Sequence, residues 1–230
     1  ERAFGVSREF QEVMGRPIGK IRFIGVWDTV SSVGWFPVTF PYTARTDSFV
    51  NGRHAISIDE RRAFFRTNRW NVKPGDDVKQ VWFAGAHCDV GGGYAPEQSG
   101  LSQIALEWMI DESAASGLLF DPERAQAVLG GAAPEVQPDH KAPVHNPFQD
   151  HPFWRVLEFV PKQHVNMSTD PPKAGWKVYL FSRREIRDGE MLHQSVIDRT
   201  QTPGLKYAPK LPKTYQIEPW GGSQARTAAT

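Results

Sequence analysis

Two side chains able to act as an acid and a base follow two predicted strands of this sequence. Asp28 comes directly after the apolar run at residues 21–27, and His87 follows the β-forming run at residues 78–83. Side chains at the carboxyl ends of parallel strands face the crevice where ligands bind. The chain order, acid and then base, matches the last two members of a Ser, Asp, His triad. We therefore interpret Asp28 as the acid that orients His87, and His87 as a general base.

The residues after His87 offer further polar groups. In an extended segment Asp89 would share the face of His87, where it could support the turn or compete as the acid. Cys88 would point to the opposite face, which favours a small buried filler over a Cys/His dyad. Gly91 and Gly92 lie in a run of three glycines. An anion-binding nest is one interpretation of them, but no lysine follows as in a phosphate loop, so a tight turn is preferred.

The nucleophile of such a triad is missing from the sequence. No GxSxG elbow occurs, and the nearest imitation, GVSRE at residues 5–9, lacks the second glycine and has no strand ahead of it. We therefore do not assign Ser7 as a nucleophile. Because the sequence begins at Glu1 rather than at Met, we expect it to start within a longer protein.

A metal site is an alternative use of the same residues. His87, Asp89 and Asp28 carry ligand atoms, and His193 or His54 could supply a further one. That interpretation requires a second histidine from a distant part of the sequence. His193 could equally be structural and donate to a backbone carbonyl at a turn. We expect no metal and no cofactor.

Aromatic residues follow Asp28 closely. Trp35 and Phe36 lie in the Pro- and Gly-containing stretch at residues 31–44, which predicts a loop. They could form an apolar wall for an acyl chain or a lid that contacts a membrane surface. Ordinary loop packing is the alternative.

Hydrophobic periodicity predicts an α/β fold. Residues 20–30 are typical of a strand covered on both faces, and residues 54–65 of a short helix that connects it to the next strand. The clearest helix has an apolar stripe from Leu101 to Met109 and should end near Gly117. Further expectations are helices at residues 1–14 and 122–129, a loop at 132–152, a strand at 176–181, a helical turn at 194–199 and a disordered end at 223–230.

Composition excludes several classes of protein. The 27 lysines and arginines balance 26 acidic residues, so the sequence has no basic footprint for nucleic acid. A single cysteine cannot form an intramolecular disulfide, which fits the cytoplasm of the producing cell and equally an exported protein without disulfides. No apolar run approaches the roughly 18 residues of a membrane span, and no signal peptide opens the sequence, so any export would follow another route.

Four ordered segments resemble an α/β-hydrolase family, formerly a domain of unknown function, that includes the type 1 lipase effectors of type VI secretion. They are IRFIGVWDTVSSVGWF, HAISIDERRAFF, VWFAGAHCDVGGGY with LSQIALEWM, and MLHQSVIDR, and the resemblance covers residues 1–210. It implies Asp28 as the acid, His87 as the base and a serine in an upstream GFSRGA elbow. Cys88 stands where the family often has Ser. Residues 1–222 would then be the C-terminal portion of one catalytic domain, with a mostly parallel sheet, flanking helices and long irregular loops.

The leading hypothesis is therefore a serine-dependent hydrolase of esters or lipids, of esterase or phospholipase type. The sequence would carry the acid and the base without the nucleophile, so we expect it to be inactive by itself. A metal-dependent hydrolase built on His87, Asp89 and Asp28 is the first alternative. A non-catalytic domain of the same fold is the second.

Overall fold

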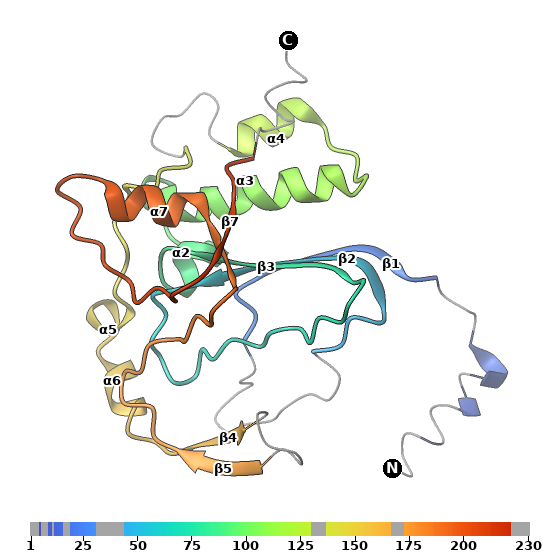
Figure 1. Ribbon diagram of the computed structural model, residues 1–230, viewed down its shortest axis with the longest axis horizontal. Helices are drawn as coiled ribbons and strands as arrows, with labels where there is room; N and C mark the ends of the chain where they lie inside the picture. Colours follow the sequence, from blue (N-terminus) through green and yellow to red (C-terminus); the bar gives the residue numbers. More distant parts are fainter. Residues whose placement is uncertain are drawn as a thin grey trace.

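A parallel sheet forms the centre of the molecule. The computed structural model describes residues 5, 9–10, 12–15, 19–30, 44–129, 137–166 and 173–221. Five strands pair in the order β1-β2-β3-β6-β7, and every neighbouring pair is parallel (Figure 1). The predicted α/β class with a mostly parallel sheet is confirmed. The strands are β1 (Ile21–Trp27), β2 (Phe49–Ser57), β3 (Asp77–Phe83), β6 (Met191–His193) and β7 (Gln216–Glu218).

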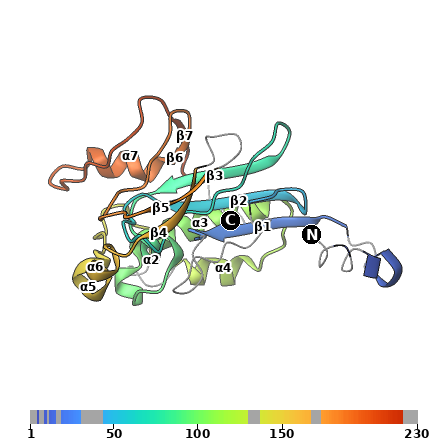
Figure 2. The same cartoon turned by 90° about the horizontal axis from the view of Figure 1, so that it is seen from below.

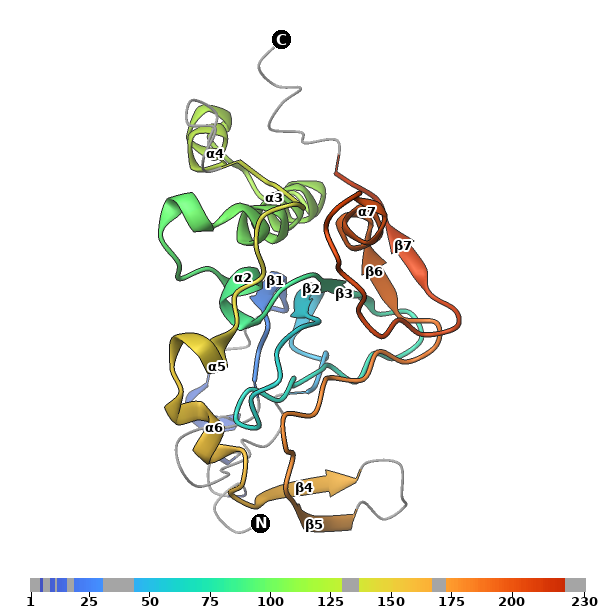
Figure 3. The ribbon, with the colours of Figure 1, turned by 90° about the vertical axis from the view of Figure 1, so that its left-hand side faces the viewer.

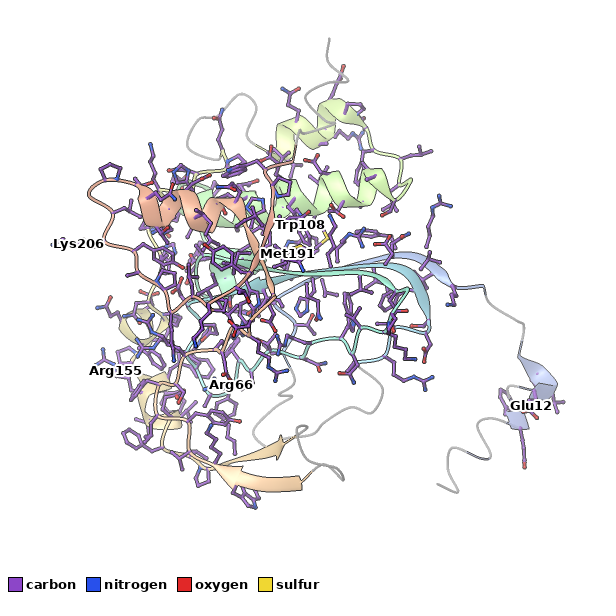
Figure 4. All side chains as sticks on the ribbon, viewed as in Figure 1. Glu12, Arg66, Trp108, Arg155, Met191 and Lys206 are labelled. Carbon is purple, nitrogen blue, oxygen red and sulfur yellow. The ribbon has the colours of Figure 1, made fainter. Side chains whose placement is uncertain are left out.

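The first face of the sheet is covered by α3 (Gly100–Ala115). Ala55, Val81 and Phe83 alternate along β2 and β3, so their side chains share this face. They pack against the predicted apolar stripe of the helix, which is buried along its length and includes Trp108, labelled in Figure 4. This helix is confirmed, and it ends at Ala115, just before Gly117, whose φ of +88° suits glycine.

The opposite face is covered by the C-terminal part of the chain. Ile56 and Trp82, which are register partners on β2 and β3, pack in one cluster with Leu192 of β6 and Val196 of α7 (Gln194–Gln201). The predicted helical turn at residues 194–199 is thereby confirmed and makes up most of α7. Both faces of the central strands are thus buried, as parallel sheets require.

The predicted helix over residues 54–65 is wrong, because most of the first half of that segment belongs to β2. Two polar residues of this strand, Arg53 and His54, are buried at 5% and 0% exposure. Arg53 forms ion pairs with Glu112 of α3 and, at 2.9 Å, with Asp77 of β3. The charge of Arg53, which in the sequence looks solvent-exposed, is therefore paired with carboxylates inside the fold. The consequence is that β1 and β3 flank β2 and do not pair with each other.

The strand at residues 20–30 exists as β1, but its predicted cover on both faces is wrong. It lies at the edge of the sheet, and its residues are half-buried or exposed. The predicted helix at 122–129 is confirmed as α4 (Pro122–Val128), with Asp121 as its N-cap. The predicted strand at 176–181 is largely wrong, since only its first two residues belong to β5 (Lys173–Lys177).

Several short elements gather at the carboxyl ends of the strands. They are α2 (His87–Gly91), α5 (Pro147–Asp150) and α6 (Phe153–Leu157), which lie together in Figure 2. The predicted loop at residues 132–152 is thus interrupted by α5. Beyond α6, β4 (Lys162–Asn166) and β5 form an antiparallel pair, at the opposite end of the molecule from α4 in Figure 3. A 3-10 turn, Pro96–Gln98, precedes α3.

Some predictions fall on residues that the structure does not describe. Ser7, Trp35, Phe36 and the predicted disorder at residues 223–230 lie outside the described ranges. Of the predicted N-terminal helix, residues 12–14 are helical and exposed. Among the described helices none is long and apolar enough to cross a bilayer.

Candidate functional site

The structure brings Asp28 and His87 into direct contact. Nδ1 of His87 lies 2.7 Å from Oδ2 of Asp28. Asp28 is the first residue after β1, and His87 opens α2 four residues after the end of β3. Both ends lie at the same edge because the strands are parallel. The Asp28 side chain is fully buried, whereas that of His87 is 27% exposed, so the ring connects a buried carboxylate with the surface.

Two further residues hold Asp28. The backbone N–H of Ser57 donates to Oδ1 at 2.9 Å. Arg184 donates to both oxygens, through Nη1 to Oδ1 and through Nη2 to Oδ2 at 3.1 Å. Burial by itself would raise the pKa of Asp28, but the Arg184 charge and the hydrogen bonds from His87, Arg184 and Ser57 outweigh it, and the pKa falls well below its usual range. Asp28 is therefore an anion at neutral pH.

Arg184 reaches Asp28 through a buried network of its own. Its side chain is 4% exposed, and Nη1 also donates to the Ser57 carbonyl at 3.0 Å and the Ser57 hydroxyl at 2.7 Å. Nη2 donates to the carbonyl of Phe65. The fixed fork of a guanidinium suits such two-sided contact with a carboxylate. Arg184 thus ties the acid to the end of β2 and to the following loop.

His87 is fixed by its backbone and by one aromatic neighbour. Its N–H donates to Oε2 of Glu60 at 3.2 Å, and the Phe65 ring meets the imidazole edge-on at 4.8 Å between centroids. Glu60 is itself buried, and although burial opposes it, contact with Arg62 lowers its pKa. Among the described residues no hydrogen bond occupies Nε2 of His87. The ring is therefore oriented through Nδ1, and Nε2 is left for another group.

Asp89 does not share the environment of Asp28. Residues 87–91 form a helical turn rather than the predicted extended segment, and Asp89 is bound to His145, with Oδ1 2.6 Å from Nδ1. Oδ2 accepts from the N–H of Ala86 at 2.8 Å and from that of His145 at 3.1 Å. Burial raises the pKa of Asp89, although the contacts with His145 and Ala86 lower it. The idea that Asp89 competes as the acid is wrong in this geometry, whereas a supporting role for its carboxylate stays a prediction.

The glycines around α2 serve two different needs. Gly85 has a φ of +115°, and a Cβ there would lie 2.3 Å from Cβ of Asp89, so only glycine allows this close approach. Gly91 ends the helix, and the N–H of Gly92, whose φ is +83°, donates to the Cys88 carbonyl at 2.9 Å. The predicted tight turn is thus the end of a helix.

Cys88 is half-buried, and neighbouring side chains on a helix do not face each other. Burial raises the pKa of its thiol. An activated cysteine nucleophile requires the opposite change in pKa. The geometry thus supports the interpretation of Cys88 as filler.

The two additional histidines of the metal hypothesis lie in structural positions. His193 is the N-cap of α7, where Nδ1 accepts from the N–H of Ser195 at 3.2 Å, and its ring stacks on Phe83 at 4.7 Å. His54 accepts from the N–H of Thr29 at 3.2 Å. Burial lowers the pKa of each histidine to about 4. Within the described ranges no cluster of three or more His, Cys, Asp or Glu side chains could hold a metal ion, so the metal interpretation lacks its ligand set.

Sequence patterns did not reveal Arg184, Ser57 or Glu60. Arg184 lies in the charged stretch RREIRDGE, which looks like an exposed turn. Ser57 ends the strand that was predicted as a helix, and Glu60 lies in the loop that follows it. Their position in the chain could have served as a signal, because Ser57 ends β2 and Glu60 follows it at the edge where Asp28 and His87 meet.

The fold and the site together define an α/β protein with an Asp–His pair at the carboxyl edge of a parallel sheet. Residues 2–112 match the family described as "T6SS, Phospholipase effector Tle1-like, catalytic domain". The predicted resemblance to phospholipase effectors of type VI secretion is confirmed over that segment. It includes β1, β2, β3 and α2, and hence both Asp28 and His87.

A curated relative extends the comparison to yeast. An uncharacterized protein of Saccharomyces cerevisiae, YEL023C, is 32% identical over 85 residues, which cover 35% of this chain and 12% of the relative. The chain thus spans only a small part of that protein's length. No solved structure matches the chain.

Proposed function

We propose that this chain supplies the acid and the base of a serine-dependent hydrolase that cleaves ester bonds in lipids. The observation that supports this most directly is the contact between Nδ1 of His87 and Oδ2 of Asp28, with the imidazole partly exposed. The similarity to a phospholipase effector domain supports a lipid as the substrate. Residues 1–222 are the C-terminal portion of that catalytic domain in this proposal.

In this mechanism His87 takes a proton from a serine hydroxyl through Nε2 as the oxygen attacks the ester carbonyl. It then returns the proton to the leaving alcohol. Asp28 holds the tautomer that carries the proton on Nδ1 and stabilises the imidazolium while it exists. Asp89 supports α2, which carries His87.

The nucleophile in this proposal comes from outside the described residues. Ser57 is buried and bound to Arg184, and Ser195 is buried within the cap of α7. Neither hydroxyl approaches Nε2 of His87 among the described contacts. The 230-residue chain should therefore not turn over an ester by itself.

The test uses the full-length protein, in which this proposal places a serine elbow upstream of Glu1. His87→Gln and Asp28→Asn should each lower kcat/KM on a phospholipid by roughly 10³-fold or more, because both act on the same proton transfer. His151→Gln is the matched control, since His151 is exposed and follows α5, and it should keep full activity. Activity within tenfold of the wild type in His87→Gln would refute the proposal.

A further inference from the structure

Exposed apolar side chains lie on α6, directly after it and on β5, near the candidate site. Phe153 and Val156 of α6 are 60% and 62% exposed, and Phe159 and Val160 directly after the helix are 62% and 42% exposed. Beside them Trp176 of β5 is 72% exposed. We call these five residues the apolar surface.

The outward position of this surface follows from how α6 packs. Trp154 and Leu157 turn inward, where Trp154 meets the Phe65 ring at 5.4 Å. Phe153, Val156 and Val160 lie three and four residues apart and so share the other side. A segment that is apolar on both sides is normally buried on both. In this structure one side is exposed, which favours a partner that covers it.

The segment that carries α6 lies between the apolar surface and the base. Phe65 contacts His87 at 4.8 Å and Trp154 at 5.4 Å, so the inner side of α6 borders the site. The N–H of Phe181 donates to Glu158 at 3.0 Å, which ties the segment after β5 to the end of α6. Figures 1 and 3 show α5 between α2 and α6, and the β4–β5 pair beyond α6. Whatever covers the apolar surface therefore contacts the segment whose inner side borders the candidate site.

Charge identifies the partner. Residues 151–183 contain five lysines and arginines against two acidic residues, while the whole chain is nearly neutral. Lys162 is buried, and the cations described as exposed in this stretch are Arg155, Lys177 and Arg183. One of those two acids, Glu158, is fully buried and accepts backbone N–H groups of Ala63 and Phe181. Arg155, labelled in Figure 4, and Lys177 are exposed beside the apolar side chains. An apolar surface with a basic border fits a bilayer that contains anionic lipids.

We propose that the apolar surface docks the protein on an anionic phospholipid bilayer, so that the Asp28–His87 pair lies near the membrane. The choice of a lipid partner is favoured by the proposed hydrolysis of lipids, but the docking itself needs no turnover. It can therefore be measured with the 230-residue chain, and its failure is distinguishable from failure of the hydrolase proposal.

The test is cosedimentation with vesicles of phosphatidylcholine alone and of phosphatidylcholine with phosphatidylglycerol. The wild type should bind the mixed vesicles more tightly, and added salt should weaken that binding. Val156→Ser with Phe159→Ser should weaken it by roughly tenfold or more, since two apolar side chains no longer enter the bilayer. Leu119→Ser with Phe120→Ser is the matched control, because those side chains are 99% and 41% exposed between α3 and α4, far from the apolar surface.

A charge variant tests the second half of the docking proposal without touching an apolar side chain. Lys177→Glu should weaken binding to the mixed vesicles, whereas Lys210→Glu, an exposed lysine outside the apolar surface, should not. Absence of binding to either vesicle would overturn the proposal, as would equal loss in a variant and its control. A wild-type dimer that the Val156→Ser, Phe159→Ser variant converts to a monomer would also overturn it, because a second copy would then be the partner.

Discussion

Arg184 contacts both carboxylate oxygens of Asp28, and it shares Oδ2 with Nδ1 of His87. Arg184 and Asp28 are 4% and 0% exposed, so the ion pair is closed off from water. An acid that must orient a histidine needs a fixed carboxylate, and a bidentate arginine fixes both of its oxygens. Arg184 is therefore a positioning residue for Asp28 in the proposed mechanism.

Removing Arg184 should be severe. Arg184→Gln leaves the Asp28 charge buried with fewer partners, and we expect a loss of about 3–5 kcal/mol in the free energy of unfolding at pH 7. Arg184→Lys keeps the charge but not the fork, so it should recover part of that loss. Urea unfolding at pH 7 measures both. Equal stability of Arg184→Gln and the wild type would contradict the role of the pair.

The same pair predicts how stability depends on acid. Because the folded protein lowers the pKa of Asp28, the stabilisation is present above the unfolded pKa of about 4 and is lost as the pH falls below it. In Arg184→Gln the pKa of Asp28 in the folded protein should lie closer to its value in the unfolded protein. Less of the free energy of unfolding is then lost as the pH falls. The difference in stability between the two proteins should therefore narrow below about pH 4. A gap that stays constant between pH 5 and pH 3 would contradict this.

Buried histidines make a separate contribution at higher pH. The pKa values of His54 and His193 are lowered to about 4 by burial, so each stays neutral in the folded protein where it charges in the unfolded one. Stability should fall as the pH drops from about 6.5 to about 4, by on the order of 1 kcal/mol per pH unit for each. His193→Asn keeps an N-cap acceptor for α7. It should remove the contribution of His193 to the dependence of stability on pH. The exposed His151→Asn should leave the slope unchanged, and urea midpoints at pH 7 and pH 5 decide between them.

Asp89 should matter for the segment that covers α2. Asp89→Asn removes the buried charge that His145 and Ala86 contact, and we expect a loss of about 2–4 kcal/mol with faster proteolysis within residues 137–146. Asp139→Asn is the control, because Asp139 is exposed and accepts only from the nearby Lys141 N–H. Unchanged proteolysis in Asp89→Asn would show that this contact does not hold the segment.

Substitutions at Gly85 and Gly75 distinguish the cost of a strained backbone from the cost of a steric collision. Both have positive φ, +115° and +91°, but a Cβ at Gly75 meets nothing within 4 Å whereas one at Gly85 meets Asp89 at 2.3 Å. Gly75→Ala should cost about 1 kcal/mol. Gly85→Ala should cost clearly more, because α2 must shift. Thermal unfolding of the two variants measures the difference, and similar melting temperatures would contradict the close packing at Gly85.

The sequence was sufficient to predict the parts of the fold that follow simple periodicity. The apolar residues of β1, β3 and α3 repeat at the spacing of a strand or a helix, so these elements could be predicted. Asp28 and His87 were found because they follow β1 and β3. β2 was missed because Arg53 and His54 are polar residues in a buried strand. Their partners, Glu112 and the N–H of Thr29, come from distant parts of the chain.

Arg184 was missed for a related reason. Its role depends on a contact with Asp28 across 156 residues of sequence, and local pattern carries no information on such a pair. The sequence pattern also did not reveal the helical turn at His87. That turn brings Asp89 so close to Gly85 that no Cβ fits at position 85. Local sequence therefore predicted the strands and the chemical groups, whereas the partners that fix those groups required the structure.

The position of β1 at the edge of the sheet has a consequence for how this chain behaves in solution. On its outer side β1 pairs with no strand in the described ranges, and Ile21 is 52% exposed there. An open edge with apolar side chains is a template on which another strand can add. Concentrated samples should therefore associate edge to edge. A lysine at position 21, which leaves the backbone ladder intact, is the simplest way to keep the isolated chain monomeric.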